Sequence, residues 1–412
     1  MRIRASRPAA VAALLALSPA AGWAGGFVFT VNAFEDLPDA DTGDGVCDAD
    51  LAAADLQCTL RAAVQQANAS VAPDLIELPA GLFRLTRRGS GEDAAATGDL
   101  DLTAPVTLRG AGRALTVVDG KKAKDRVFDA FGGATFEHLT IRGGQALVSD
   151  ELGGGGIRAL GLVADVTLRD VLVTKNKSRD DAAGIYVEIG TALIEDSVIS
   201  ANKASDDGAG FDTDGGEIVF RRTTFSKNKS GDEGGGFESS GGSLFVENCT
   251  FSGNKAVEGG AMNLEEGSTT TIVGSTIAKN KAKQGSGIYL EDMDGGLDDQ
   301  LMLQNTIVAN NPKTNCTGEP IDSLGHNLES GTSCGLAGTG DLTATDPRLL
   351  KLADNGGPTP THALRDDSPA IDAGGVCGKG LTNDQRGQAR VDVPGVGPGT
   401  DSCDIGAFEF VP

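Results

Sequence analysis

A repeat of 26 residues constrains the fold of this chain more than any other feature. Five Asn-Lys pairs follow one another at that interval: Asn176-Lys177, Asn202-Lys203, Asn228-Lys229, Asn254-Lys255 and Asn280-Lys281. A fixed period of this length indicates a stack of equivalent supersecondary units, each of which contacts only its neighbours. The repeat therefore predicts a solenoid.

Each unit contains short stretches in which apolar residues occupy alternate positions. Ile218 and Phe220 are spaced in this way, Arg222 breaks the pattern, and Thr223 and Phe225 resume it. Alternation with a period of two is typical of half-buried strands, and glycine at fixed points of the unit would weaken helices. The pattern predicts two strands that are joined by a kink.

The same positions recur in neighbouring units as columns. The first inner column holds Leu168, Ile194, Phe220, Val246 and Ile272, the second holds Val173, Ile199, Phe225, Phe251 and Ile277, and the kink column holds Asp170, Asp196, Arg222, Asn248 and Gly274. A third strand is expected after each loop, where small residues precede Ile185, Phe211, Phe237 and Met262. Three short strands per unit predict an all-β protein, a right-handed parallel β-helix of the pectate-lyase-like kind.

The two residues that mark the repeat carry different expectations. The asparagine is predicted to be structural, because its side-chain amide can bond the equivalent amide one rung away. The stacked lysines repel one another, and an acidic column four residues on, at Asp181, Asp207 and Glu233, is expected to offset that repulsion. We therefore expect a solvated, charge-balanced face; the alternative is a lysine stripe that binds polyanions.

The N-terminus predicts export. Residues 1–24 have arginines at the start, an apolar middle and the small-x-small site Gly22-Trp23-Ala24, the pattern of a secretory signal peptide. No other apolar stretch approaches this length, so no integral membrane span is expected. The formal net charge is −23, and loss of the three signal arginines makes it more negative. This charge disfavours nucleic acid as a partner and favours divalent cations.

A short helix is predicted after Cys58. Leu60, Val64 and Ala67 fall on one helical face, and Thr59 is a suitable N-cap. A β-helix needs its open end covered, because exposed strand edges invite aggregation. We therefore expect this helix to form the N-terminal cap.

Seven cysteines in an exported chain predict disulfides. Their local spacing favours Cys47–Cys58, Cys316–Cys334 and Cys377–Cys403, although spacing does not prove connectivity. Cys249 is left over at an inner strand position, where a small buried free thiol is expected rather than a nucleophile.

Motifs along the chain resemble known families. Cys58–Ala69 (CTLRAAVQQANA), with Asp41–Cys47 (DTGDGVC), resembles the CSLREA-type N-terminal region of secreted β-helix proteins, although Thr59 and Ala62 replace its usual serine and glutamate. Four C-terminal motifs resemble the choice-of-anchor Q domain: Asp354–Thr359 (DNGGPT), Ser368–Gly374 (SPAIDAG), Asp384–Gly387 (DQRG) and Cys403–Glu409 (CDIGAFE). Phe225–Asn228 and Phe251–Asn254 are similar to the FxxN element of polymorphic outer-membrane protein repeats.

These resemblances imply a β-helix fold and an exported location. Choice-of-anchor Q domains usually precede a surface anchor. The printed chain ends three residues after the last motif, so secretion is expected rather than anchoring.

Parallel β-helices also carry polysaccharide lyases and hydrolases, so catalysis is a second hypothesis. Asp206-Asp207-Gly208 is similar to the paired aspartates of polygalacturonases. For a calcium-assisted lyase, Arg221 or Arg222 is a candidate base, and the residues that could gather a cation are Asp206, Asp207, Asp212, Asp214 and Glu233. The Asn-Thr-Asp, Gly-His-Gly and Arg-Ile-Lys elements of that hydrolase family are missing from the sequence. Asp206, Asp207 and Arg222 are the catalytic candidates; the alternative is that the aspartates belong to the acidic stripe.

Calcium is the one cofactor that the sequence suggests. The loop that holds Asp39, Asp41, Asp44, Asp48 and Asp50 is rich in the oxygen ligands that Ca²⁺ prefers, although its spacing differs from that of an EF-hand. A solvated acidic loop is the alternative. The run Asp292, Asp294, Asp298 and Asp299 is a second, weaker candidate.

The sequence as a whole predicts an exported, monomeric interaction module that binds a glycan or another cell-surface ligand. The alternative is a polysaccharide lyase or glycoside hydrolase. The expected organisation is a signal peptide at 1–24, an N-terminal cap with the first rungs at 25–100, a β-helix at 101–312 and a choice-of-anchor Q-like region at 313–412.

Overall fold

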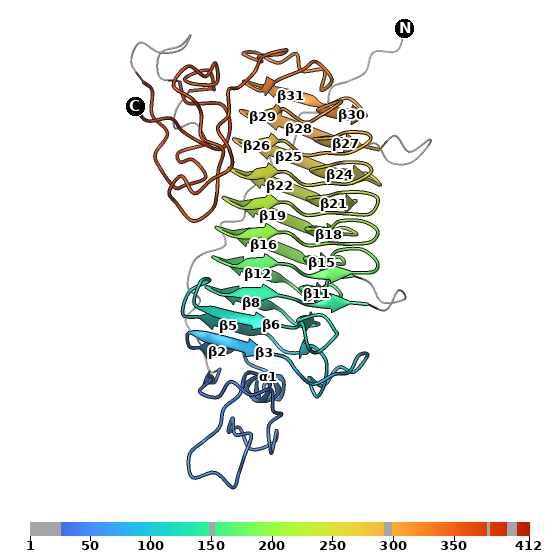
Figure 1. The fold of residues 1–412 in the computed structure, drawn as a ribbon, viewed down its shortest axis with the longest axis vertical. Coiled ribbons are helices and arrows are strands. Elements are labelled where there is room, and N and C mark those ends of the chain that lie inside the picture. The colour runs from blue at the N-terminus through green and yellow to red at the C-terminus, as the bar shows by residue number, and fades with distance from the viewer. Residues whose placement is uncertain (1–25, 148–152, 292–298, 377–379, 394–401) are drawn as a thin grey trace.

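The computed structural model describes residues 26–147, 153–291, 299–376, 380–393 and 402–412. In these residues the chain forms a right-handed parallel β-helix, with α1 (Leu60–Asn68) at one end and rungs that stack along the long axis (Figure 1). The named strands pair in parallel, each with its equivalent in the next rung. The predicted fold class is confirmed.

The rungs place their strands in three long sheets. The first, sheet A, consists of β1 (Val28–Thr30), β2 (Asp74–Leu78), β5 (Val106–Gly110), β8 (Ala134–Glu137), β12 (Val166–Arg169), β16 (Thr191–Glu195), β19 (Glu217–Arg221), β22 (Ser243–Glu247), β25 (Thr269–Val273), β28 (Gln300–Gln304) and β31 (Asp322–Gly325).

Sheet B follows each strand of sheet A across the kink. It consists of β3 (Gly81–Arg84), β6 (Thr116–Asp119), β9 (Thr140–Arg142), β13 (Leu172–Thr174), β17 (Val198–Ser200), β20 (Thr224–Ser226), β23 (Thr250–Ser252), β26 (Thr276–Ala278), β29 (Ile307–Ala309) and β32 (Leu328–Glu329). A small ribbon beside it pairs β10 (Gln145–Ala146) with β14 (Lys177–Ser178).

Sheet C completes each rung after the loop. It consists of β4 (Leu100–Leu102), β7 (Phe128–Ala130), β11 (Ile157–Ala159), β15 (Ile185–Val187), β18 (Phe211–Thr213), β21 (Phe237–Ser240), β24 (Met262–Glu265), β27 (Ile288–Leu290) and β30 (Cys316–Gly318). Strands β30 to β32 carry the three sheets to Glu329, beyond residue 312, where the repeat in the sequence fades.

The core lies between the three sheets and consists of the predicted columns. Phe220 of sheet A, Phe225 of sheet B and Phe237 of sheet C are each 0% exposed, and their rings pack with centroids 4.9 to 6.3 Å apart. At the kink, Asp196, Arg222 and their equivalents have positive φ angles near 50°. The left-handed backbone turns the chain sharply from sheet A into sheet B, which is why the alternation breaks there.

The asparagines form the predicted ladder. The amide nitrogen of Asn202 donates to Asn228 Oδ1 at 3.1 Å, and that of Asn228 donates to Asn254 Oδ1 at 3.1 Å. Each amide nitrogen also donates to a carbonyl of the preceding rung, and each Oδ1 accepts the backbone N–H of the asparagine below. The ladder continues through Asn280 to Asn311. Every side chain in it is therefore bonded while buried, as neutral buried polar groups require.

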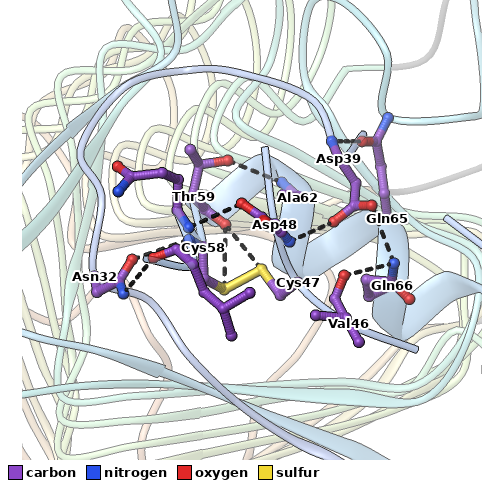
Figure 2. The surroundings of a disulfide bond; sticks show 12 residues. Asn32, Asp39, Val46, Cys47, Asp48, Cys58, Thr59, Ala62, Gln65 and Gln66 are labelled. Carbon is purple, nitrogen blue, oxygen red and sulfur yellow. Dashed lines mark hydrogen bonds between the residues drawn. A yellow bond between two sulfur atoms is a disulfide. The ribbon is translucent and has the colours of Figure 1, made fainter. Parts of the chain in front are cut away.

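The N-terminal cap is also as predicted (Figure 2). Thr59 caps α1 by accepting a hydrogen bond from the Ala62 N–H at 3.1 Å, and Leu60, Val64 and Ala67 are buried against the first rungs. Arg61 is fully buried, where it pairs with Asp36 at 2.6 Å and donates to backbone carbonyls of the loop at residues 95–99. The cap is thus fixed to the β-helix by packing and by a buried ion pair.

Two of the predicted disulfides are formed, Cys47–Cys58 beneath the cap and Cys316–Cys334 at the far end. The third expected pair involves Cys377, which lies outside the described residues. Cys249 is free and buried, and burial raises the pKa of its thiol to about 12. The expectation of an inert buried thiol agrees with this environment.

The C-terminal region folds back along the β-helix, beside the rungs of β19 to β29 (Figure 1). Gln385, within the DQRG motif, donates to Thr224 Oγ1 and accepts from Thr250 Oγ1 on sheet B. Arg390 is buried between Glu409 at 3.2 Å and Asn248 Oδ1 at 2.8 Å. Gln385 and Arg390 therefore hold this region to the middle rungs.

Candidate functional site

The outer surface of sheet C carries most of the unusual chemistry of the molecule. Between β15 and β27 its outward side chains form three parallel columns, which we call together the acidic face. The loop column consists of Asp181, Asp207, Glu233 and Glu258; the central column of Tyr186, Asp212, Glu238, Asn263 and Tyr289; and the end column of Glu188, Asp214, Ser240, Glu265 and Glu291.

The strand register creates the central column. The middle residue of each short sheet C strand points outward between two inward residues, so Tyr186 lies beside Asp212 and Glu238 beside Asn263 in adjacent rungs. In a parallel stack this spacing is about 4.8 Å. The backbone also holds the like-charged Asp212 and Glu238 as near neighbours, because the preceding residues Phe211 and Phe237 pair in register.

Side-chain contacts join the columns across the face. Ser240 Oγ lies 2.9 Å from both Glu238 Oε1 and Glu265 Oε1. Asp212 and Glu238 lie side by side in adjacent rungs, and carboxylate oxygens of Glu265 and Glu291 lie within 4.8 Å of each other. Carboxylates held this close repel one another unless protons or cations lie between them.

Burial and crowding raise the pKa of most of these groups. Burial is the main cause for Asp207 and Asp212, whose pKa rises to about 7, and for Glu233, whose pKa rises to about 8. The hydrogen bond with Glu265, followed by burial, raises the pKa of Glu291 to about 7. Asp207, Asp212, Glu233 and Glu291 therefore titrate near neutral pH.

Two neighbours on the face are shifted in opposite directions. Burial and the nearby Asp212 raise the pKa of Glu238 well above its usual range. Burial also acts on Glu265, but hydrogen bonds from Glu291, Glu238 and Ser240 outweigh it and lower the pKa of Glu265. One carboxyl group is thereby favoured as a proton donor and its neighbour as an acceptor.

A second group of carboxylates lies under the loop that precedes β4. Asp99, Asp101 and Asp129 are all buried, with carboxylate oxygens within 4.8 Å of one another. Arg126 lies 3.6 Å from Asp99 and 3.7 Å from Asp129, and Arg158 also pairs with Asp129. Burial, followed by repulsion from neighbouring aspartates, raises the pKa of Asp99 to about 9. This cluster is closed and partly neutralised by arginine, unlike the acidic face.

The structure brings together two of the three catalytic candidates. Asp207 belongs to the loop column, and Asp206 forms an exposed cluster with Asp180 and Asp181 beside it. Arg222 lies instead at the kink between sheets A and B, where it pairs with Asp196 at 2.7 Å. Its backbone carbonyl accepts a hydrogen bond from Thr359 of the C-terminal region. Arg222 is therefore not placed to act with the two aspartates.

The N-terminal aspartates serve the backbone of their own loop. Asp39 Oδ2 accepts the N–H of Asp48, and Asp41, Asp44 and Asp50 accept N–H groups two residues further on (Figure 2 shows Asp39 and Asp48). None of the three carboxylate clusters in the described residues includes them. The geometry gives the predicted calcium loop no support, and of the second candidate run only Asp299 lies within the described residues.

The lysine ladder has the predicted register. Lys177, Lys203, Lys229, Lys255 and Lys281 pair as successive parallel bridges and are exposed. Among the described residues no lysine lies within 4.0 Å of a carboxylate. Asp181 and Asp207 instead accept the backbone N–H groups of Asp207 and Glu233 one rung on. The lysines are therefore solvated, as expected, without direct ion pairs to the acidic column, and the charge balance between the two columns stays a prediction.

A comparison with protein families agrees with the fold. The family described as "Right handed beta helix region" matches residues 156–334. No curated protein matches the chain. A similar solved structure is the crystal structure of pectate lyase Pel9A, with a TM-score of 0.48 and 16% sequence identity over 94% of this chain and 97% of that one. No helix in the described part of the chain is long and apolar enough to cross a membrane.

Proposed function

We propose that the protein is an exported glycan-binding module whose acidic face is the binding surface. The observation that carries this proposal is the continuity of the face. The loop and end columns are half-buried or exposed and run along the five consecutive rungs of β15 to β27, while the central column between them is buried except for Tyr289. Carboxylate oxygens of the two accessible columns can accept hydrogen bonds from sugar hydroxyls, and an extended row of them suits an extended chain.

The negative charge of the acidic face indicates which class of glycan it could bind. The outward central positions from Tyr186 to Tyr289 include no basic residue, and Asp207, Glu233 and Glu265 flank them. Such a surface favours neutral or amino-sugar polymers and repels acidic ones unless a cation lies between. It also offers no base for a lyase of acidic polysaccharides, since Arg222 lies at another corner.

Export remains part of the proposal. The signal peptide expected at 1–24 and the CSLREA-type and choice-of-anchor Q resemblances support it, and the two disulfides suit an oxidising compartment. Sequencing the N-terminus of protein recovered from the medium or cell surface tests it. A mature chain that begins near residue 25 is expected, whereas an uncleaved cytoplasmic chain would contradict export.

Glycan binding is tested on an array that includes neutral, amino-sugar and acidic polysaccharides, with and without calcium. The double variant Asp214→Asn, Glu233→Gln is expected to lose most of the binding, because both carboxylates lie on the face. The matched control is Glu217→Gln, an exposed residue on sheet A, which should bind like the original protein. Binding that is equal in all three proteins, or absent from folded protein on every glycan, would overturn the proposal.

A glycoside hydrolase is the second candidate, favoured by the opposed pKa shifts of Glu238 and Glu265. A hydrolase uses a protonated carboxyl group beside an ionised one. Against this role, Glu238 is only 3% exposed. Release of new reducing ends from an array ligand, abolished by Glu238→Gln, would replace the binding function with hydrolysis.

A further inference from the structure

One place on the acidic face gathers three carboxylates from consecutive rungs. Glu233 precedes β21, Glu265 ends β24 and Glu291 follows β27. Each contributes a carboxylate oxygen to a group whose members lie within 4.8 Å of one another. All three side chains are half-buried, so the group lies at the surface and solvent reaches it.

A buried amide points to a ligand at the same place. Asn263 is 0% exposed and its amide nitrogen donates to the Glu233 carboxylate, while its Oδ1 has no hydrogen-bond partner in the described residues. A buried carbonyl oxygen without a partner costs free energy that a bound group can recover. The oxygen and nitrogen of such an amide are assigned from their bonding, so a cation that pulls Oδ1 toward the carboxylates would supply the missing contact.

The cluster has no cationic side chain beside it. Within the described residues none of the three glutamates pairs with lysine, arginine or histidine. The buried aspartates of the first rungs are different, because Arg126 and Arg158 pair with them. The same sheet thus has one carboxylate cluster that is compensated by arginine and one that has no cationic side chain.

We propose that Glu233, Glu265 and Glu291, together with the amide oxygen of Asn263, form a calcium-binding site. The ligands are all oxygen atoms, as a hard divalent cation prefers, and their irregular arrangement suits the variable geometry of Ca²⁺ better than the octahedron of Mg²⁺. Three carboxylates and one amide leave coordination positions open to solvent. Those positions would hold sugar hydroxyls, a consequence that rests on the proposed glycan-binding function.

Calcium binding is measured directly by titration calorimetry of the purified full protein after treatment with a chelator. We expect a site with a dissociation constant of about 10⁻⁴ M, the range of extracellular calcium modules, and weaker binding of Mg²⁺. Glu291→Gln is expected to weaken calcium binding about tenfold or more. The matched control is Glu266→Gln, because Glu266 is exposed and adjacent in sequence to a proposed ligand but lies outside the cluster.

Terbium luminescence places the ion independently of these substitutions. The sequence has two tyrosines, and its one tryptophan lies in the expected signal peptide. Tyr289 pairs in register with Asn263, so it should sensitise emission from Tb³⁺ bound at the cluster. Tyr289→Phe should abolish the emission while calcium binding by calorimetry persists. Tyr186→Phe, further along the same column, should keep it.

The outcomes separate this site from glycan binding, because no glycan is present in either experiment. Folded protein that binds no calcium at 10⁻² M, about a hundred times the expected constant, would overturn the site and leave glycan binding to its own test. Binding unchanged by Glu291→Gln, or emission unchanged by Tyr289→Phe, would move the ion elsewhere and equally overturn it. Calcium binding with no glycan response would retain the site and remove only its bridging role.

Discussion

Two ladders run through the same rungs of this β-helix and have opposite character. The asparagine ladder, from Asn176 to Asn311, is buried, neutral and bonded from one rung to the next. The acidic face, one loop further along each rung, stacks carboxyl groups whose burial raises their pKa. Stacking repeats the same side-chain interaction in every rung. The asparagine column therefore stabilises the fold, whereas the carboxyl groups of the acidic face repel one another.

This difference separates scaffold from site. A repeated neutral amide satisfies its neighbours at every step, and no ligand is needed. Repeated carboxylates lack such a solution until protons, cations or a bound partner arrive. Repulsion between carboxylates over five rungs does not stabilise the fold. For this reason we place the function on the acidic face.

Breaking the neutral ladder should have the largest destabilising effect. Asn228→Ala removes the acceptor of two hydrogen bonds from Asn202 and a donor to the Ile199 carbonyl and to Asn254. Several buried polar groups would then lack partners. We expect a loss of about 3–5 kcal/mol in the free energy of unfolding, measured by denaturant titration. A loss below about 1 kcal/mol would show that the ladder is not a main support of the stack.

The buried cluster of Asp99, Asp101 and Asp129 should make the stability of the protein depend on pH. Because the pKa of Asp99 is raised to about 9 in the folded chain, the folded state binds this proton more tightly than the unfolded state. The stability that this group contributes is complete below about pH 4 and is lost as the pH rises toward 9. Asp99→Asn should therefore match the original protein at low pH and exceed its stability by roughly 5 kcal/mol at pH 8, because pH 8 lies about four units above the unfolded pKa and each unit is worth about 1.4 kcal/mol.

Thermal unfolding of both proteins across this pH range checks the sign. A variant that loses stability relative to the original as the pH rises would mean that Asp99 is held ionised by Arg126. In that case the arginine contacts, rather than burial, control the cluster.

Removing one charge from the acidic face should stabilise the chain by a smaller amount. Glu238→Gln keeps the shape of the side chain and its contact with Ser240 but removes the repulsion from Asp212 and Glu265. In chelator at pH 8 we expect a gain of about 1 kcal/mol, opposite in sign to Asn228→Ala. If chemical denaturation shows instead that Glu238→Gln destabilises the protein, the carboxyl group of Glu238 makes stabilising contacts that outweigh the repulsion.

The lysine ladder should have the smallest effect. Lys229 is exposed and has no carboxylate within 4.0 Å in the described residues. Lys229→Gln should change the free energy of unfolding by less than about 0.5 kcal/mol, with a slight gain at low salt as one repulsive neighbour disappears. A larger loss would show that the neighbouring acidic column stabilises this lysine after all.

The sequence predicted the scaffold in detail because its signals are periodic. The inner columns, the kink, the asparagine ladder, the cap helix and the pairs Cys47–Cys58 and Cys316–Cys334 all occupy the expected places. These features depend on contacts between equivalent positions of neighbouring rungs. A fixed spacing therefore identifies the partners without knowledge of the rest of the fold.

The sequence predicted only part of the acidic face, because not all of its contacts join equivalent positions of the repeat. Its cluster joins different positions of the unit, Glu233 from a loop, Glu265 and Glu291 from strand ends, across a unit that is one residue shorter. The alternation Phe237-Glu238-Ser239 and Met262-Asn263-Leu264 could have identified the central column, since each outward residue is polar between inward ones. Which carboxylates meet depends on loop conformation, which the spacing does not encode.

The return of the C-terminal region to the middle rungs has a consequence for how the molecule is completed during synthesis. A plain stack can grow from its N-terminal cap one rung at a time, and its last rung frays first. Here Gln385 hydrogen-bonds to Thr250 and Arg390 to Asn248. Both C-terminal residues are synthesised more than a hundred residues after their partners, so they contact rungs that are already complete. Growth along the axis therefore ends with a lateral closing step, and a chain cut short before residue 380 would lack the clasp.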